Sequence, residues 1–321
     1  MRLKDIPVLV PAKLNPHALE RIRKEFDCIE IVSGNPALIT SDIAARVRGI
    51  AAMTVISADL MRALPKLEIV ANFGVGYDAV DAAHAGRNSI MVTNTPDVLT
   101  EEVADTTIGL LLNTVRELSA SEAYMRAGHW SAKGNYRLTP LTLRGRTVGI
   151  YGMGRIGQAI AKRLEPFGVG IHYHNRRKAD GLSYYYHSTL VELASAVDTL
   201  IIVVPGGEAT HKAINGEVLA ALGPQGVLIN IGRGSTVDED ALIAAMHSGT
   251  IAAAGLDVFE NEPNIRQEFF DLPNTVLLPH VGSASVHTRM AMGNLCVDNL
   301  VGWFSGTGAV TPVLETVHLQ P

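Results

Sequence analysis

The chain has 321 residues, of which 47% are hydrophobic and 18% charged, so it is long enough for two globular domains, each with its own core. The net charge of −5 gives no electrostatic basis for binding nucleic acid or an anionic membrane surface. No apolar run reaches the roughly 18 to 20 residues of a membrane span, and the short, proline-broken apolar stretch at the N-terminus is not typical of a signal peptide. With Cys28 and Cys296 as the only cysteines, we expect no disulfide framework and a cytoplasmic location.

The first part of the chain predicts a small α/β domain. Helical stretches separate several short strand-like runs, which span residues 7–10, 28–32, 51–57, 67–74 and 90–95. Parallel strands need crossover connections, so this alternation predicts a parallel sheet.

A long helix is predicted next, within residues 95–130 and beginning at Thr100, where two glutamates follow in the first turn. One face of this helix is apolar and carries Val103, Thr107, Leu110, Leu111 and Val115. We expect the helix to bridge two domains. Its apolar surplus suits a subunit interface about as well as burial within one chain, and both readings stay open.

From Arg146 the alternation restarts and predicts a second α/β domain. Six strand-like runs span residues 146–152, 169–175, 199–205, 226–232, 252–259 and 275–282, the usual number of strands in a doubly wound sheet. A last helix is predicted over 287–306 and is expected to return to the first domain.

The predicted fold class is therefore α/β, with two Rossmann-like or flavodoxin-like domains built on doubly wound parallel sheets and a cleft between them. We expect residues 1–98 with 289–321 to form a substrate-binding, catalytic domain. Residues 99–288 are expected to form a dinucleotide-binding domain.

A glycine loop opens this second domain. Gly152, Gly154 and Gly157 form G-x-G-x-x-G directly after a predicted strand and at the start of a predicted helix, which is the context that a dinucleotide site needs. Gly152 permits a tight turn, Gly154 lets the backbone approach a pyrophosphate, and Gly157 allows close helix packing. The amides of Arg155 and Ile156 would then face the phosphates. The alternative is a structural turn without a ligand.

The end of the next predicted strand indicates which dinucleotide binds. An NAD site usually has an acidic residue here, but this chain has Asn175, Arg176 and Arg177. Guanidinium groups pair with a 2′-phosphate, which a carboxylate would repel. We therefore expect NADP(H) to be preferred, with NAD(H) left open. The alternative is that the two arginines merely begin a solvated helix.

Three later segments, at residues 228–242, 255–263 and 277–285, resemble the D-isomer-specific 2-hydroxyacid dehydrogenases in wording and order. Residues 71–81 and 100–112 match earlier motifs of the same family, and the resemblance covers essentially the whole chain. It implies hydride transfer between a nicotinamide cofactor and a 2-keto or 2-hydroxy acid.

The resemblance implies a catalytic set of Arg233, Glu262 and His280. Arg233 would grip the substrate carboxylate or carbonyl oxygen through its fork of donors, and His280 would supply or remove the proton. Glu262 would favour the protonated imidazole. Taken singly, the three residues could be a structural salt bridge, a surface charge and a histidine satisfied by the backbone.

Further roles follow from the same resemblance. The backbone amides of Val75 and Gly76 would receive the substrate carboxylate, and Asp257 would bind the nicotinamide carboxamide, with a packing or capping role as the alternative. Three more residues are expected to border the cofactor: Pro205, Thr210 and Ile231. Gly206 and Gly207 depart from the family's usual wording after Pro205, which leaves the phosphate contacts of that loop open.

Because it lacks an acidic ribose ligand, the chain resembles those family members that are NADPH-dependent glyoxylate and hydroxypyruvate reductases. These enzymes form glycolate and D-glycerate. The alternatives are a family dehydrogenase for another 2-keto acid and a dinucleotide-sensing, corepressor-like binding protein.

Residues 128–138 resemble a segment that reaches a neighbouring subunit, so we expect a homodimer. Trp130 and Tyr136 would either shape substrate size or pack the interface. His172 and His174 share one strand face and are interpreted as structural rather than metal-binding.

Overall fold

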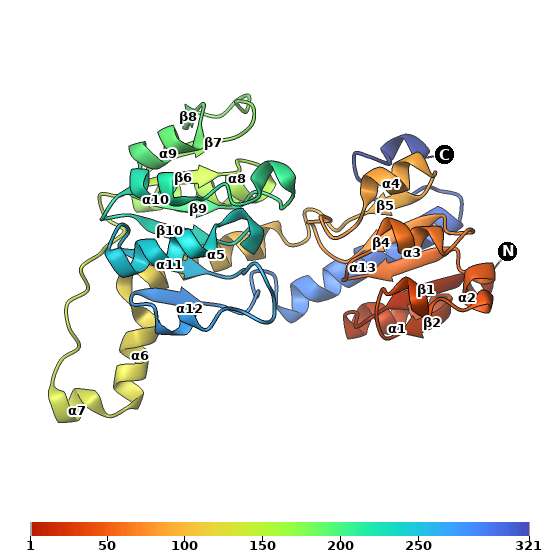
Figure 1. The fold of residues 1–321 in the computed structure, drawn as a ribbon, viewed down its shortest axis with the longest axis horizontal. Coiled ribbons are helices and arrows are strands. Elements are labelled where there is room, and N and C mark those ends of the chain that lie inside the picture. Colours follow the sequence, from red (N-terminus) through yellow and green to blue (C-terminus); the bar gives the residue numbers. More distant parts are fainter. Residues whose placement is uncertain (1, 321) are drawn as a thin grey trace. The chain divides into compact units, whose positions relative to one another are not determined.

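The computed structural model describes residues 2–320 and divides into two compact units, drawn in Figure 1. Unit 1 is formed by Met1–Leu99 with Ala284–Pro321, and unit 2 by Thr100–Ser283. The chain returns from unit 2 to unit 1 between Ser283 and Ala284, ahead of the last helix and not within it. Ser285 caps that helix by accepting the N–H of Thr288. Between residues 2 and 320 no helix has the length and apolar character needed to cross a membrane.

Unit 1 contains a five-stranded sheet in the order β2-β1-β3-β4-β5, and every pair is parallel. This order is that of a flavodoxin-like doubly wound sheet. Its strands are β1 (Pro7–Pro11), β2 (Asp27–Ile31), β3 (Gly49–Ala52), β4 (Ile69–Asn72) and β5 (Met91–Thr93). Its helices are α1 (Pro16–Glu25), α2 (Ser41–Arg46), α3 (Ala58–Arg62), α4 (Ala82–Arg87) and α13 (Val286–Phe304).

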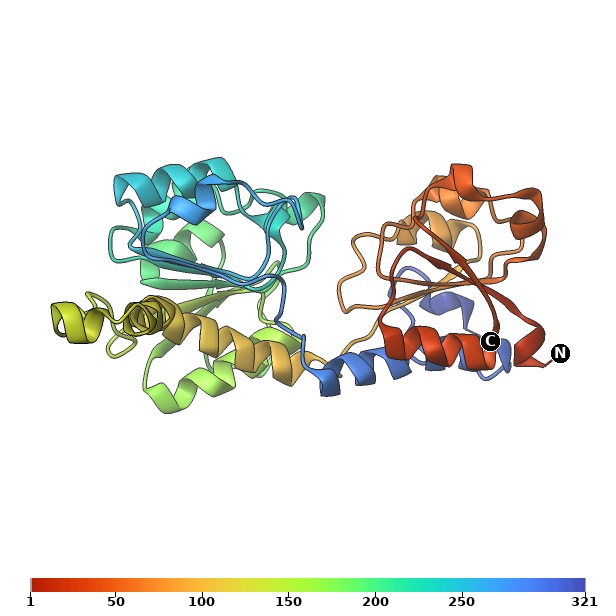
Figure 2. The same cartoon turned by 90° about the horizontal axis from the view of Figure 1, so that it is seen from below.

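The last helix, α13, packs beside α1 on one face of this sheet, as Figure 2 shows. Its buried residues include Met292, Cys296 and Leu300. The predicted helix over 287–306 is therefore confirmed. One strand was placed wrongly: β3 ends at Ala52, whereas the pattern predicted 51–57, because the apolar Met53 and Val55 are 50% and 62% exposed.

Unit 2 contains a seven-stranded, wholly parallel sheet in the order β12-β11-β10-β9-β6-β7-β8. Its strands are β6 (Thr147–Tyr151), β7 (Gly170–His174), β8 (Tyr185–His187), β9 (Thr199–Ile202), β10 (Val227–Asn230), β11 (Ala253–Leu256) and β12 (Thr275–Leu277). Its helices are α5 (Thr100–Arg116), α6 (Leu118–Arg126), α7 (His129–Lys133), α8 (Arg155–Leu164), α9 (Leu190–Ala196), α10 (Gly216–Leu222), α11 (Glu239–Ser248) and α12 (Glu268–Asp271). The α/β fold class with doubly wound parallel sheets is thus confirmed.

Two features of unit 2 differ from the sequence predictions. Six strands were expected, and the edge strand β8 is the seventh. The long helix ends at Arg116, because Glu117 adopts a left-handed conformation with φ of 51°, and α6 and α7 follow as separate pieces. The apolar face of α5 is confirmed as buried, against α8 and the strands β10 to β12 of the same unit. Burial within one chain is therefore the reading that holds.

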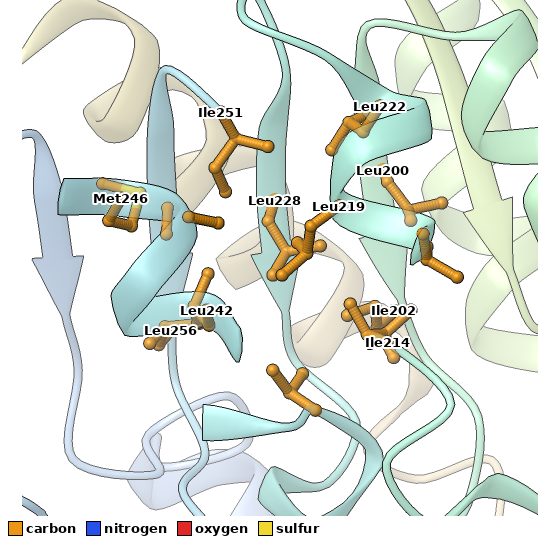
Figure 3. Close-up of a cluster of buried hydrophobic side chains, with 14 of the residues drawn as sticks. Leu200, Ile202, Ile214, Leu219, Leu222, Leu228, Leu242, Met246, Ile251 and Leu256 are labelled. Atoms are coloured by element: carbon orange, nitrogen blue, oxygen red, sulfur yellow. The ribbon is translucent and has the colours of Figure 1, made fainter. Parts of the chain in front are cut away.

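The core of unit 2 lies on both faces of the sheet. Figure 3 shows the cluster between the sheet and helices α10 and α11, where Leu200, Leu219, Leu228 and Leu242 interdigitate. Each fully buried side chain of this size contributes roughly 1.5–3 kcal/mol to folding. This packing surrounds the strands, and the loops that leave their carboxyl ends carry the polar residues described next.

Candidate active site

The glycine loop joins β6 to α8 at the point where the order of the strands reverses, the usual ligand position in such sheets. Gly152 has a φ of 109°, and a Cβ there would lie 2.9 Å from Val204. A Cβ on Gly157 would lie 2.1 Å from the carbonyl oxygen of Gly152. Neither position tolerates a side chain. At Gly154, by contrast, a Cβ would meet no described atom within 4 Å, so its Cα faces open space where a ligand can approach.

The N-terminus of α8 follows this loop. Among the described residues no side chain caps the helix at Gly154, so the first-turn amides of Arg155 and Ile156 are suited to an anion. Asn175, just after β7, accepts the N–H of Met153 at 2.7 Å and ties the two loops together. Arg176 and Arg177 are exposed beside it. Burial raises the pKa of Tyr151, and the positive charge of Arg176 partly opposes that rise, which places this guanidinium near the end of β6.

The other predicted cofactor neighbours follow the ends of β9, β10 and β11. Thr210 donates its hydroxyl to the carbonyl oxygen of Pro205 at 2.7 Å and so closes the loop after β9. Ile231 is 7% exposed directly after β10, and Asp257 is 1% exposed directly after β11. The residues predicted for the cofactor therefore lie together at the carboxyl ends of the strands, which we call this edge of the sheet.

Arg233 stands three residues after β10, at the start of the 3-10 turn Gly234–Thr236. Its carbonyl oxygen accepts hydrogen bonds from the side chains of Asn230 (3.0 Å) and Thr236 (2.6 Å). Gly234 lies against the next loop so closely that a Cβ would be 1.8 Å from the carbonyl carbon of Phe259. This contact brings the Arg233 loop against the loop that carries Glu262.

Glu262 and His280 form a hydrogen-bonded pair, with 2.7 Å between Oε2 and Nδ1. An ionised carboxylate can only accept, so the ring donates through Nδ1 and keeps Nε2 for a substrate. Burial raises the pKa of Glu262. The hydrogen bonds from His280 and from the N–H of Phe259, with the positive charges of His280 and Arg233, outweigh burial and hold that pKa below its ordinary value. Glu262 therefore interacts with both of the other residues of the predicted catalytic set, by a hydrogen bond to His280 and through the charge of Arg233.

The backbone of His280 is held in an unusual conformation. Its φ is 54°, a left-handed value that costs energy for a residue with a side chain. Asp257 holds the segment in place: its carbonyl oxygen accepts the N–H of His280 (2.8 Å), and its carboxylate accepts those of Val281 (2.7 Å) and Gly282 (2.9 Å). Burial raises the pKa of Asp257, and these amides oppose the rise. The capping role named as the alternative for Asp257 is thus present, and its contact with the nicotinamide carboxamide stays a prediction.

Glu239, at the start of α11, contacts the loop that carries Glu262, and the sequence reasoning missed this contact. Its side chain is 6% exposed and accepts the N–H of Glu260 at 2.9 Å, inside the loop that carries Glu262. Burial raises the pKa of Glu239 above its ordinary value. The only signal in the sequence was its position six residues after Arg233, which does not reveal the contact.

Val75 and Gly76 lie in unit 1, in the loop that follows β4. No hydrogen bond from either backbone N–H is found within residues 2–320. Two neighbouring amides without a partner suit a carboxylate. Asn72 and Asn94, which hold this loop, were also missed by the sequence reasoning.

The two histidines of β7 meet a third that the sequence reasoning did not pair with them. Nδ1 of His172 lies 2.9 Å from Nε2 of His187 on β8, and Nδ1 of His174 donates to the carbonyl oxygen of His187 at 2.9 Å. Burial, and then the charge of His187, lower the pKa of His172. These hydrogen bonds tie the edge strand β8 to the sheet, and within residues 2–320 no group of three ligand side chains with metal-site geometry occurs.

Comparison with known families gives a match over residues 108–282, to the model for the NAD binding domain of the D-isomer specific 2-hydroxyacid dehydrogenases. Among curated proteins, the chain is 42% identical over 315 residues to glyoxylate/hydroxypyruvate reductase A HPR2 of Arabidopsis thaliana, covering 97% of this chain and 100% of the relative. It is 40% identical over 314 residues to 2-ketogluconate reductase of Gluconobacter oxydans, covering 97% and 98%.

Among solved structures, the chain is similar to the NADPH-dependent glyoxylate/hydroxypyruvate reductase SmGhrB of Sinorhizobium meliloti, in complex with NADP and malonate. The two are 59% identical, with a TM-score of 0.95 and 97% of each chain covered. A 2-hydroxyacid dehydrogenase of Ketogulonicigenium vulgare is 38% identical, with a TM-score of 0.89 and coverage of 98% and 99%.

Proposed function

This chain belongs to the D-isomer specific 2-hydroxyacid dehydrogenase family, and we propose that it reduces a small 2-keto acid, glyoxylate or hydroxypyruvate, to glycolate or D-glycerate with NADPH. The observation that carries the proposal is the Glu262–His280 pair beside Arg233, at the sheet edge that also bears the glycine loop. The similarity to reductases of these substrates supports it.

The residues divide the reaction among them. Arg233 binds the carbonyl oxygen of the substrate through its guanidinium and stabilises the negative charge that grows there. NADPH, when bound, supplies the hydride that adds to the carbonyl carbon. The π electrons of the carbonyl move to its oxygen, which takes the proton from Nε2 of His280. Glu262 stabilises the imidazolium before that transfer, and the amides of Val75 and Gly76 receive the substrate carboxylate.

The glycine loop fits a dinucleotide, because Gly154 faces open space and α8 begins without a capping side chain among the described residues. Arg176 and Arg177 would pair with the 2′-phosphate. Pro205, Thr210 and Ile231 would border the cofactor, and Asp257 would bind the nicotinamide carboxamide through carboxylate lone pairs that its two backbone partners leave open. NADPH is therefore proposed as the preferred cofactor, with NADH as the weaker one.

A turnover assay tests the proposal. The parent enzyme should oxidise NADPH with glyoxylate and with hydroxypyruvate, and larger 2-keto acids such as 2-ketogluconate and hydroxyphenylpyruvate should serve as comparisons. A kcat/KM for a larger acid well above those for glyoxylate and hydroxypyruvate would move the physiological substrate to that class. No turnover across the whole panel would contradict an enzymatic role.

We also propose a homodimer formed through α6 and α7, which extend away from the sheet of unit 2 in Figure 1. Trp130 and Met125 are 57% and 56% exposed there and line a shallow recess with Tyr124 and Tyr136. Exposed aromatic residues gathered on one surface are typical of an interface.

A cytoplasmic location is proposed as well, since both cysteines are free.

Sedimentation velocity tests the dimer. Trp130→Glu should weaken association, because it places a charge in an apolar interface. Phe270→Glu is the matched control, because Phe270 has the same 57% exposure on another part of unit 2. A monomeric parent, or equal effects of the two substitutions, would contradict this interface.

A further inference from the structure

The loop after β4 has three consecutive carbonyl groups, and the interior of unit 1 holds each of them. The carbonyl oxygen of Gly74 accepts from the side chain of Asn72 (3.1 Å) and from the N–H of Thr95 (2.9 Å). That of Val75 accepts from the side chain of Asn94 at 2.8 Å. That of Gly76 accepts from the side chain of Asn72 at 3.0 Å. No carbonyl of this stretch is left to rotate freely.

Anchored carbonyls determine where the next amides point. A trans peptide unit is planar, and its C=O is directed opposite to the N–H of the following residue. Holding the carbonyl of Gly74 inward therefore turns the N–H of Val75 outward, and holding the carbonyl of Val75 inward does the same for the N–H of Gly76. These are the two amides that have no partner within residues 2–320.

A second layer of hydrogen bonds holds Asn94 itself. The hydroxyl of Thr311 donates to the backbone carbonyl oxygen of Asn94 at 2.6 Å, and the N–H of Asn94 donates to the carbonyl oxygen of Thr311 at 3.3 Å. Asn299, which is fully buried on α13, donates to the hydroxyl of Thr311 (2.9 Å) and accepts its N–H (2.8 Å). A continuous chain of hydrogen bonds thus runs from the last helix to the glycine-containing loop.

We propose that Asn94 is a positioning residue that fixes the Val75–Gly76 peptide, and that Thr311 and Asn299 hold Asn94 in turn. The segment after α13 thereby sets the affinity for the carboxylate of the substrate, although it makes no contact with it. This inference rests on the proposed function, in which the two amides receive that carboxylate. The ligand class is a small organic carboxylate.

The asparagine side chain is chemically required at this position. Its amide nitrogen donates to the carbonyl of Val75, whereas an ionised aspartate would only accept and would also repel an anionic substrate. Glycine lies on both sides of Val75, and glycine leaves the backbone free to reorient unless other contacts hold it. Loss of the Asn94 donor should therefore let the Val75–Gly76 peptide rotate and withdraw one amide from the ligand.

The experiment compares the parent with Asn94→Ala, Thr311→Val and Thr311→Ser. For Asn94→Ala we expect the KM for glyoxylate and hydroxypyruvate to rise on the order of tenfold, the effect of one lost hydrogen bond to a charged group, with the KM for NADPH unchanged. Thr311→Val should shift the substrate KM in the same direction but less. Thr311→Ser keeps the hydroxyl and should restore the parental value.

Thr316→Val is the matched control. Thr316 is as buried as Asn299, and its hydroxyl exchanges hydrogen bonds with the backbone of Val92 on β5, not with the loop. The substitution removes one buried hydroxyl from the same C-terminal segment, so it should lower the Tm without changing the substrate KM. An equal rise in KM for Thr316→Val would show that the effect is general loosening and would overturn the proposal.

Calorimetric titration with malonate on the NADP⁺-loaded protein separates the inference from the proposed function. If the parent binds malonate and Asn94→Ala binds it on the order of tenfold more weakly, the positioning role stands even without turnover of any keto acid. If the parent turns over glyoxylate and Asn94→Ala keeps both the parental KM and the parental malonate affinity, the positioning role is wrong while the proposed function survives. A parent that neither reduces keto acids nor binds malonate overturns both.

Discussion

The carboxyl ends of the two parallel sheets carry different kinds of recognition groups. In unit 1 the loop after β4 presents backbone amides, held by the neutral side chains of Asn72 and Asn94. In unit 2 the loops after β10 and β11, together with the segment after β12, present the charged side chains Arg233, Glu262 and His280. Under the proposed function, the first set of groups binds a carboxylate that does not change during the reaction. The second set acts on groups that gain and lose charge.

This difference has consequences for how each edge responds to pH and to mutation. The groups that hold the unit 1 loop do not titrate, so binding there should not depend on pH through its own supports. We expect substrate reduction at the carboxyl ends of the unit 2 strands to depend on the protonation of the Glu262–His280 pair. Backbone amides cannot be deleted by substitution, so the unit 1 edge can be tested only through the residues that orient it.

The largest effect is expected for His280→Ala, which removes the proton donor from unit 2. Reduction of glyoxylate should fall by roughly 10²-fold or more in kcat, the scale of general acid catalysis. Steady-state kinetics over a range of pH measures the loss, and NADPH binding by fluorescence should stay at the parental level. Parental rates of glyoxylate and hydroxypyruvate reduction at every pH would remove His280 from the mechanism.

Within the predicted catalytic set, Arg233→Lys is expected to rank second. Lysine keeps the positive charge but loses the planar fork of donors, so the substrate oxygen loses at least one charge-assisted hydrogen bond. We expect kcat/KM to fall by roughly tenfold or more, with both kcat and KM affected. If only KM changes, Arg233 binds the ground state and the transition state equally well.

The cofactor side of unit 2 is tested by replacing Arg176 and Arg177 together with alanine. Only NADPH carries the 2′-phosphate, so its affinity should fall by roughly tenfold for each lost contact. NADH affinity should stay near that of the parent. Equal losses for the two cofactors would show that these arginines do not contact the phosphate.

The parallel sheets and the glycine loop were predictable because their signals are local. Buried strands bounded by glycine and a helix with one apolar face are patterns that burial itself imposes. The edge strand β8 was missed because Tyr185–His187 is only three residues long and carries no apolar run. The end of α5 was missed because Glu117, at the break, is neither glycine nor proline.

The charged side chains of unit 2 were named from the family resemblance; the structure pairs Glu262 with His280, and the catalytic roles stay predictions. Their supports were not predictable. The hydrogen bond from the N–H of Glu260 to Glu239, and the chain from Asn299 through Thr311 to Asn94, join segments far apart in sequence. Asparagine and threonine also occur throughout any sequence as ordinary turn and capping residues, so nothing but the fold shows which of them orient an active site.

Glu262→Gln is expected to have a smaller effect than the substitutions above, visible mainly in pH profiles. Glutamine keeps the shape but removes the negative charge beside His280, so the high-pH limb of the reduction profile should move to lower pH. The folded-state pKa of Glu262 lies below its ordinary 4.5, so its ionised form stabilises the fold above that pH. This stabilisation is lost as pH falls through the lowered pKa.

The Tm of Glu262→Gln should accordingly lie below the parental Tm at neutral pH and meet it in acid. Both measurements compare the parent with Glu262→Gln: one follows the rate of reduction across pH, and the other follows the Tm across pH. A high-pH limb that stays in place while the Tm falls would mean that Glu262 supports the loop but does not act on His280.

The smallest effect is expected for Glu239→Gln, which tests a support of unit 2 and not its chemistry. Burial raises the folded-state pKa of Glu239 above its ordinary 4.5, so the folded protein holds this proton more tightly than the unfolded chain. The stability that results is present below pH 4.5 and is lost as pH rises through the raised pKa. The amide oxygen of glutamine can still accept the N–H of Glu260, and glutamine buries no negative charge. The Tm of the variant should therefore exceed the parental Tm at neutral pH and converge with it in acid.

Each kcal/mol corresponds to roughly 2–4 °C in Tm for a domain of the size of unit 2, so we expect this rise to be no more than a few degrees. The substrate KM and the pH profile of reduction should stay parental, because the Glu262 loop keeps its hydrogen bond. A lower Tm at neutral pH, together with a displaced pH profile, would show that the loop needs the negative charge of Glu239 and not only its acceptor oxygen. Glu239 would then belong with the charged groups that set the chemistry of the unit 2 edge, and not with the neutral supports that Asn94 exemplifies in unit 1.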